Sequence, residues 1–162
     1  MVHLPCTAAS VAVARRVLAD ELRAAGVLDG AVRDAALVVS ELLSNAILHA
    51  YPLPGGGVEV AWDVDGACVE VAVSDGGGAT TPMVGHPSEF SPGGRGLGIV
   101  AHLSLTWGVR ANGAGLTVWA VLPAPRPGHA GGAGVRGEGE PVVPRNPARR
   151  TWAAASRPGS AG

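Results

Sequence analysis

Residues 38–50 read VVSELLSNAILHA, and this stretch predicts the helix around which the rest of the chain is organised. Apolar residues recur there every three or four positions, which is the period of a helix with one buried face. Glu41 and Asn45 are four residues apart, so both side chains should project from one side of the helix, and His49 continues the line. A carboxylate and a carboxamide placed this way can serve a magnesium–nucleotide site, as base and as oxygen ligand. A polar stripe on an ordinary surface helix is the alternative, and this pattern alone does not decide between the two.

Length and cysteine usage fit one intracellular domain with a tail. The chain has 162 residues, and the separation of Cys6 and Cys68 matches neither a zinc motif nor a redox motif. The N-terminus has no signal-peptide pattern, and no apolar run is long enough to cross a bilayer. We therefore expect a cytoplasmic protein with free thiols and no membrane partner.

Charge divides the chain into an acidic body and a basic tail. Residues 1–122 contain six Arg and eleven acidic residues, a net charge of −5, whereas residues 123–162 contain six Arg and two acidic residues, a net charge of +4. Because residues 123–162 are rich in Pro, Gly, Ala and Arg and lack an apolar period, we expect them to be disordered. A nucleic-acid-binding arm is one interpretation of this tail, but a solvated extension is favoured, so we expect no direct nucleic-acid contact.

The segments of the body alternate between helical and strand patterns. A first helix is expected from a cap at Thr7 or Ser10 to about Ala25, and the organising helix from a cap at Asp29 to a point before Pro52. Strict alternation predicts strands at 58–64, 69–74, 103–110 and 116–122, with turns at Asp65-Gly66 and Asn112-Gly113 and a short helix at 97–102. This order predicts an α/β two-layer sandwich, with helices on one face of a mixed, mostly antiparallel sheet.

Two further segments carry chemistry. Asp75 ends the second strand and precedes Gly76-Gly77-Gly78, where a carboxylate is either a turn residue or an acceptor for a ligand's amino group. Gly94-Arg95-Gly96-Leu97-Gly98 leads into a helix, where backbone N–H groups can approach phosphate oxygens. Glycine makes up 25 of the 162 residues, so this glycine pattern is weak evidence when taken alone.

Taken in order, these motifs resemble the GHKL ATPase superfamily, which includes gyrase-type, chaperone, histidine-kinase and mismatch-repair ATP-binding domains. The resemblance covers about residues 4–122 and rests on the Glu-x-x-x-Asn helix, the Asp-x-Gly strand end, the glycine segment and a Thr in the last strand. The stretches SELLSNAILHA, VSDGGG, GGRGLGIV and TWGVR are most similar to the anti-sigma-factor serine kinases of bacterial partner-switching systems.

The resemblance implies ATP and magnesium as ligands and gives each motif residue a role. Glu41 would be the catalytic base, and Asn45 would hold magnesium bridged to the phosphates. Asp75 would accept a hydrogen bond from the amino group of adenine, Gly77 would let the backbone pass close to the base, and Thr117 would support the adenine contact through water. The phosphates would be held by the glycine segment, that is by Gly94, Arg95, Gly96, Leu97 and Gly98.

The segment between Asp75 and the glycine motif would form a lid. The resemblance places this lid at residues 79–93, and Arg95 either reaches the terminal phosphate or stays solvated. The family's Asp-x-Gly-x-Gly pattern ends here in Ala79, so we expect reduced lid mobility rather than lost binding. His49 would either point at the lid or, at the end of its helix, be satisfied by its neighbours, and the second interpretation is favoured.

Two functions from different classes fit these residues. The first is an anti-sigma factor with serine/threonine kinase activity toward an antagonist protein, because phosphoryl transfer mostly requires positioning and charge neutralisation. The alternative is a nucleotide-gated module that sequesters a sigma factor with negligible turnover. A third and less favoured alternative is an α/β domain that binds no nucleotide. The resemblance implies protein partners, namely a sigma factor or an antagonist, and also homodimerisation.

Overall fold

A computed structural model describes residues 1–78 and 94–127 of the chain. The lid predicted at 79–93, the side chain of Arg95 and the predicted tail from residue 128 onward lie outside the described residues. The description below therefore concerns the predicted nucleotide-binding body and the five residues that follow it.

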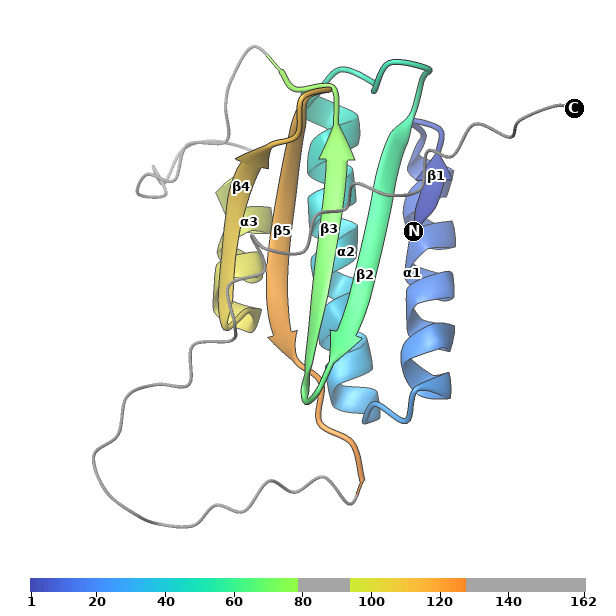
Figure 1. Ribbon diagram of the computed structural model, residues 1–162, viewed down its shortest axis with the longest axis vertical. Coiled ribbons are helices and arrows are strands. Elements are labelled where there is room, and N and C mark those ends of the chain that lie inside the picture. The colour runs from blue at the N-terminus through green and yellow to red at the C-terminus, as the bar shows by residue number, and fades with distance from the viewer. Residues whose placement is uncertain (79–93, 128–162) are drawn as a thin grey trace, which may run out of the picture. The chain divides into compact units, whose positions relative to one another are not determined.

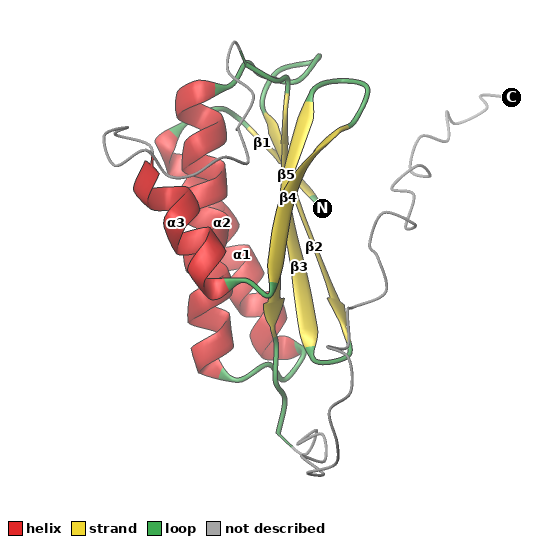
Figure 2. Ribbon diagram, turned by 90° about the vertical axis from the view of Figure 1, so that its left-hand side faces the viewer, coloured by secondary structure: helices red, strands yellow, loops and turns green. Residues whose placement is uncertain are grey.

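The described chain forms a single antiparallel sheet covered by helices on one face (Figure 1). Its elements are β1 (Val2–Leu4), α1 (Ala8–Ala24), α2 (Asp29–His49), β2 (Val58–Asp65), β3 (Cys68–Asp75), α3 (Gly94–Leu103), β4 (Thr106–Ala111) and β5 (Leu116–Pro123). The strand order is β1-β2-β3-β5-β4, and every pair in this sheet is antiparallel. Figure 2 shows α1, α2 and α3 on the same side of the sheet. The predicted α/β two-layer sandwich is confirmed.

The turn between α1 and α2 follows from one glycine. Gly26 has a φ of 77°, a left-handed conformation that costs little without a Cβ. The N–H of Gly26 donates to the carbonyl of Arg23 and that of Val27 to the carbonyl of Leu22, which is the Schellman pattern of a helix end. The predicted stop at Gly26 is confirmed.

Among the helices of the described residues, none combines the length and the hydropathy of a membrane-spanning segment.

The core lies between the sheet and the helices. Alternate residues of β2, β3 and β5 face the helices, so the valines of these strands meet the apolar stripes of α1 and α2. The fully buried side chains include Leu18, Leu22, Leu42, Leu43, Leu122, Val58, Val60, Val69 and Val71. Burial of side chains from both the helices and the sheet fixes the position and rotation of α2 relative to the sheet. Glu41 and Asn45, which are predicted to act on the nucleotide, lie on this helix.

Several boundaries differ from the sequence predictions because tertiary contacts set them. Asp29 is the first helical residue of α2 and Leu28 is its cap, with the Leu28 N–H bonded to Pro125 across the fold. The first hairpin pairs Asp65 with Cys68, so its turn residues are 66 and 67 rather than 65 and 66. Leu103 belongs to α3 and not to the following strand.

The sequence analysis did not predict β1. Val2–Leu4 is only three residues long, too short to show alternation, and it becomes a strand by pairing with β2. Leu4 is buried in this position and adds to the core at the edge of the sheet.

The described fold continues past residue 122, where the predicted domain ended. Ala124 is completely buried, and its N–H donates to the carbonyl of Ala67 over 2.6 Å. The carbonyl of Pro125 accepts the N–H of Leu28 over 2.9 Å. The chain after β5 therefore closes the end of the sandwich where the α1–α2 turn and the first hairpin lie.

Candidate nucleotide-binding site

α2 presents one line of polar side chains beside the sheet. Glu41 and Asn45 are half-buried and His49 is exposed, and they follow one another at intervals of four residues. No hydrogen bond or ion pair is formed by any of these three side chains within the part of the chain that the structure describes. Three polar groups in one row are thus available to a ligand. The described residues provide no partner for the His49 imidazole, and because residues 79–93 lie outside them, the expectation of an imidazole satisfied by its neighbours stays a prediction.

The beginning of α3 rests on Glu41. A Cβ built on Gly96 would lie 2.7 Å from Oε2 of Glu41, so a side chain at position 96 would make the end of the Glu41 side chain move. The predicted base and the predicted phosphate-binding segment, far apart in sequence, are therefore neighbours. Leu97 packs against the core, whereas Gly98 is exposed with open space around its Cα.

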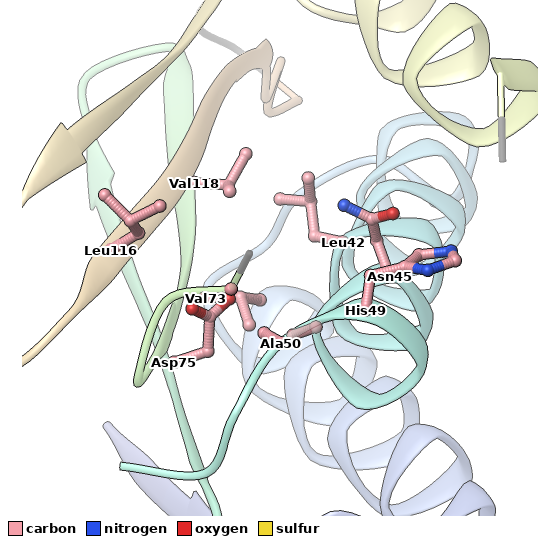
Figure 3. A pocket seen from close by; sticks show the side chains of 10 residues that line it. Leu42, Asn45, His49, Ala50, Val73, Asp75, Leu116 and Val118 are labelled. Carbon is pink, nitrogen blue, oxygen red and sulfur yellow. The ribbon is translucent and has the colours of Figure 1, made fainter. Parts of the chain in front are cut away.

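A pocket lies between the second half of α2 and the ends of β3 and β5 (Figure 3). The hollow encloses about 370 Å³ when the part open to solvent is included. Most of its wall is apolar, and its polar side chains are those of Asn45, His49 and Asp75. The complete lining is Leu42, Asn45, Ala46, His49, Ala50, Val73, Asp75, Gly78, Leu116 and Val118. Such a lining is suited to a ligand that has a flat apolar ring with a few polar atoms at its edge.

Asp75 is the buried polar anchor of this pocket. Its side chain is 6% exposed, and its Oδ1 accepts the N–H of Gly77 over 2.7 Å. Burial raises the pKa of Asp75 above its ordinary value, and the hydrogen bond from Gly77 opposes part of that change. The φ of Gly77 is 78°, which turns the chain so that its N–H meets the carboxyl group. The predicted aspartate thus lines the pocket, and it ends β3 rather than closing a hairpin.

Close backbone packing holds Asp75 in place relative to α2. The N–H of Tyr51 donates to the carbonyl of Gly77 and the N–H of Gly76 to the carbonyl of Tyr51, over 2.7 and 2.8 Å. A Cβ on Gly76 would collide with the carbonyl of Pro52, and a Cβ on Gly115 would collide with the carbonyl of Asp75. The sequence analysis did not assign these roles to Gly76 and Gly115, because only the folded chain brings the three backbone segments together.

The structure contradicts the predicted role of Thr117. In the register of β3 and β5, Asp75 pairs with Leu116 and Ser74 pairs with Thr117, so alternation turns the Thr117 side chain to the sheet face away from the pocket. There its hydroxyl lies 2.8 Å from that of Ser74 and accepts the side-chain N–H of Asn112 over 2.9 Å. The side chain facing the pocket at this place is Leu116.

The predicted site residues therefore fall into three groups. Asn45 and Asp75 line the pocket, whereas Glu41, one turn of α2 before Asn45, lies against the start of α3 and is not among the lining residues. Thr117 is excluded from the pocket, and His49 and Leu116 belong to it. The side chain of Arg95 and the lid lie outside the described residues.

The chain belongs to the histidine kinase-like ATPase domain family, whose family model matches residues 4–122. This is a GHKL-type ATPase domain, and the matched range contains the described sandwich together with residues 79–93. A search of curated proteins gave no match.

Among solved structures, the fold is similar to the RsbU and RsbW domains of Rv1364c from Mycobacterium tuberculosis. The TM-score is 0.60 at 22% identity, covering 78% of this chain and 32% of that one. The histidine kinase domain of a blue-light activated histidine kinase from Erythrobacter litoralis gives a TM-score of 0.44 at 28% identity, covering 58% of this chain and 45% of that one. The chain thus spans less than half the length of either structure.

Proposed function

We propose that this domain binds Mg-ATP in the pocket beside α2 and acts as a serine/threonine kinase of the anti-sigma-factor type, phosphorylating an antagonist protein. The observation that carries the proposal is the row formed by Glu41 and Asn45. Both side chains lack a partner within the described residues, and the backbone of Gly96 approaches the Glu41 carboxylate. A module that only bound nucleotide would not need a free carboxylate where a glycine-rich helix begins.

The walls of the pocket suit an adenine ring. Val73, Leu116 and Val118 provide apolar surface from the sheet, and Asp75 is the one carboxyl group among the lining residues. Its Oδ1 is engaged by Gly77, which leaves the other oxygen to accept the amino group of the base. We assign Asp75 to base recognition on this ground.

Asn45 is suited to magnesium only when phosphates share the ion. The described residues contain no cluster of three or more His, Cys, Asp or Glu side chains that could hold a metal. The Asn45 carboxamide offers one oxygen to a hard cation, and the remaining ligands would be phosphate oxygens and water. Bound there, magnesium would neutralise charge on the phosphates.

Glu41 would then act on the protein substrate. Its carboxylate would accept the proton of a serine hydroxyl while the serine oxygen bonds to the γ-phosphorus and the bond to ADP breaks. Backbone N–H groups around Gly94 to Gly98, at the N-terminus of α3, would stabilise the charge on the transferring phosphoryl group. Each of these groups lies on α2 or α3, so their mutual placement depends on the core beneath the helices.

The kinase proposal is tested with calorimetry and label transfer. Wild-type protein and Glu41→Gln should both bind Mg-ATP, while only the wild type should transfer label from ATP to a candidate antagonist. Glu59→Gln is the matched control, because its register with Ser74 places Glu59 on the sheet face away from the helices. Equal label transfer by Glu41→Gln, or none by the wild type to any antagonist, would overturn the proposed activity.

The second candidate, sequestration of a sigma factor without turnover, is favoured by a different observation. Leu37 and Leu48 are 42% and 73% exposed, three turns apart on the outer side of α2. Exposed leucines in one row are suited to contact with a protein partner. A pull-down in which Glu41→Ala retains a sigma factor, with nucleotide bound, would support this function.

A further inference from the structure

The row on α2 contains one polar side chain that the proposed function leaves without a role. Glu41 and Asn45 have proposed partners in the substrate hydroxyl and in magnesium. His49 lines the same pocket, and its ring forms no hydrogen bond with any described residue. Figure 3 shows its imidazole next to the Asn45 side chain, farther from Asp75 than Asn45 is in this view.

The height of His49 along α2 is fixed by the backbone around it. His49 is the last helical residue, and Tyr51, two positions later, is hydrogen-bonded to Gly77 next to Asp75. A Cβ on Gly78 would lie 2.7 Å from the carbonyl of His49, so β3 and its glycines close directly onto this helix end. Asn45 and His49 are about 6 Å apart along the helix axis. The step from Asn45 to His49 therefore leads from the part of the site proposed for the phosphates toward the part proposed for the base.

A nucleotide has its sugar at the intermediate level. With the base against Asp75 and the phosphates near Asn45, the ribose must occupy the turn of α2 that carries His49. A neutral imidazole has one N–H donor and one nitrogen acceptor, and a ribose hydroxyl can both accept and donate. We infer that His49 hydrogen-bonds a ribose hydroxyl of the bound nucleotide and thereby favours ribonucleotides over deoxyribonucleotides, an inference that rests on the proposed ATP site.

The test compares three nucleotides on two proteins by calorimetry. Wild type and His49→Ala are titrated with the magnesium complexes of ATP, 2′-deoxy-ATP and 3′-deoxy-ATP. One deoxy form should bind the wild type about three- to tenfold more weakly than ATP, the worth of one hydrogen bond. His49→Ala should lose the same factor toward ATP and should no longer distinguish that deoxy form from ATP.

Two further variants keep the comparison sharp. Val13→Ala alters an α1 residue that is 46% exposed and does not line the pocket, and it should bind all three nucleotides like the wild type. His49→Gln keeps a donor and an acceptor and should recover part of the preference. Circular dichroism confirms that each variant is folded.

The outcomes separate this inference from the proposed function. If the wild type binds Mg-ATP but His49→Ala binds it equally well, or loses the same factor toward all three nucleotides, the ribose contact is wrong and the ATP site stands. If the wild type binds no Mg-ATP, the proposed function itself is wrong.

Discussion

Asp75 is buried at the end of β3, where it lines the pocket and its carboxyl group is costly to ionise. Because burial raises its pKa, the folded protein holds a proton there that the unfolded chain releases, and stability falls as pH rises between the ordinary pKa of aspartate and the raised value. Proteins often tolerate such a cost at a binding site.

We expect Asp75→Asn to be more stable than the wild type at neutral pH. The carboxamide removes the buried charge, and its oxygen can still accept the N–H of Gly77. The difference should vanish at a pH below the ordinary pKa of aspartate, where the wild-type carboxyl group is neutral in both states. Urea denaturation at several pH values measures this, and a pH-independent difference would contradict it. The Asp75→Asn variant should also bind Mg-ATP more weakly than the wild type.

Two adjacent residues of β5 should respond in opposite ways. Thr117→Val removes a hydroxyl bonded to Ser74 and Asn112, so it should lower the free energy of unfolding by about 1–2 kcal/mol and leave Mg-ATP affinity unchanged. Leu116→Trp should fill the pocket and weaken Mg-ATP binding about tenfold or more, ~1.4 kcal/mol, with little effect on folding. Chemical denaturation and calorimetry on both variants provide the measurements. Weaker ATP binding by Thr117→Val would restore the role predicted from the sequence.

At the scale of elements, the start of α3 has two glycines with different constraints. Both lie in a helix, where alanine is favoured over glycine by about 0.5–1 kcal/mol. Gly98 has open space, but a Cβ on Gly96 would meet the carboxylate of Glu41. The resemblance gave both glycines the same phosphate-binding role, whereas of the two only a Cβ at position 96 would meet a neighbour, the end of the Glu41 side chain.

Alanine substitutions distinguish these two positions. Gly98→Ala should raise the free energy of unfolding by about 0.5–1 kcal/mol through helix propensity. Gly96→Ala should gain less, because its Cβ must displace the Glu41 side chain, and that displacement should also lower the rate of label transfer. Urea denaturation of both variants tests the first effect and the kinase assay on Gly96→Ala the second. Equal stabilisation with full activity would show that α3 does not rest on Glu41.

At the scale of the whole molecule, the domain needs a few residues beyond the matched family region. A chain ending at Pro127 should keep the fold and bind Mg-ATP, because the described contacts after β5 are then complete. A chain ending at residue 122 should lose about 2 kcal/mol of stability, since it lacks the hydrogen bonds of Ala124 to Ala67 and of Leu28 to Pro125. Thermal and urea denaturation of the two truncated chains measure the difference. Equal stability would mean that residues 123–127 do not close the sandwich.

The sequence by itself determined the local features of this protein: the period of α2, the alternation of β2, β3 and β5, the stop at Gly26, and the polar line from Glu41 to Asn45. These depend on neighbours in sequence, so pattern and turn chemistry were sufficient. The tertiary structure decided what depends on residues far apart in the chain: the edge strand β1, the stacking of Gly76 and Gly115, and the approach of α3 to Glu41. It also decided which of Leu116 and Thr117 faces the pocket, because a shift of one residue in strand register reverses the face of every side chain.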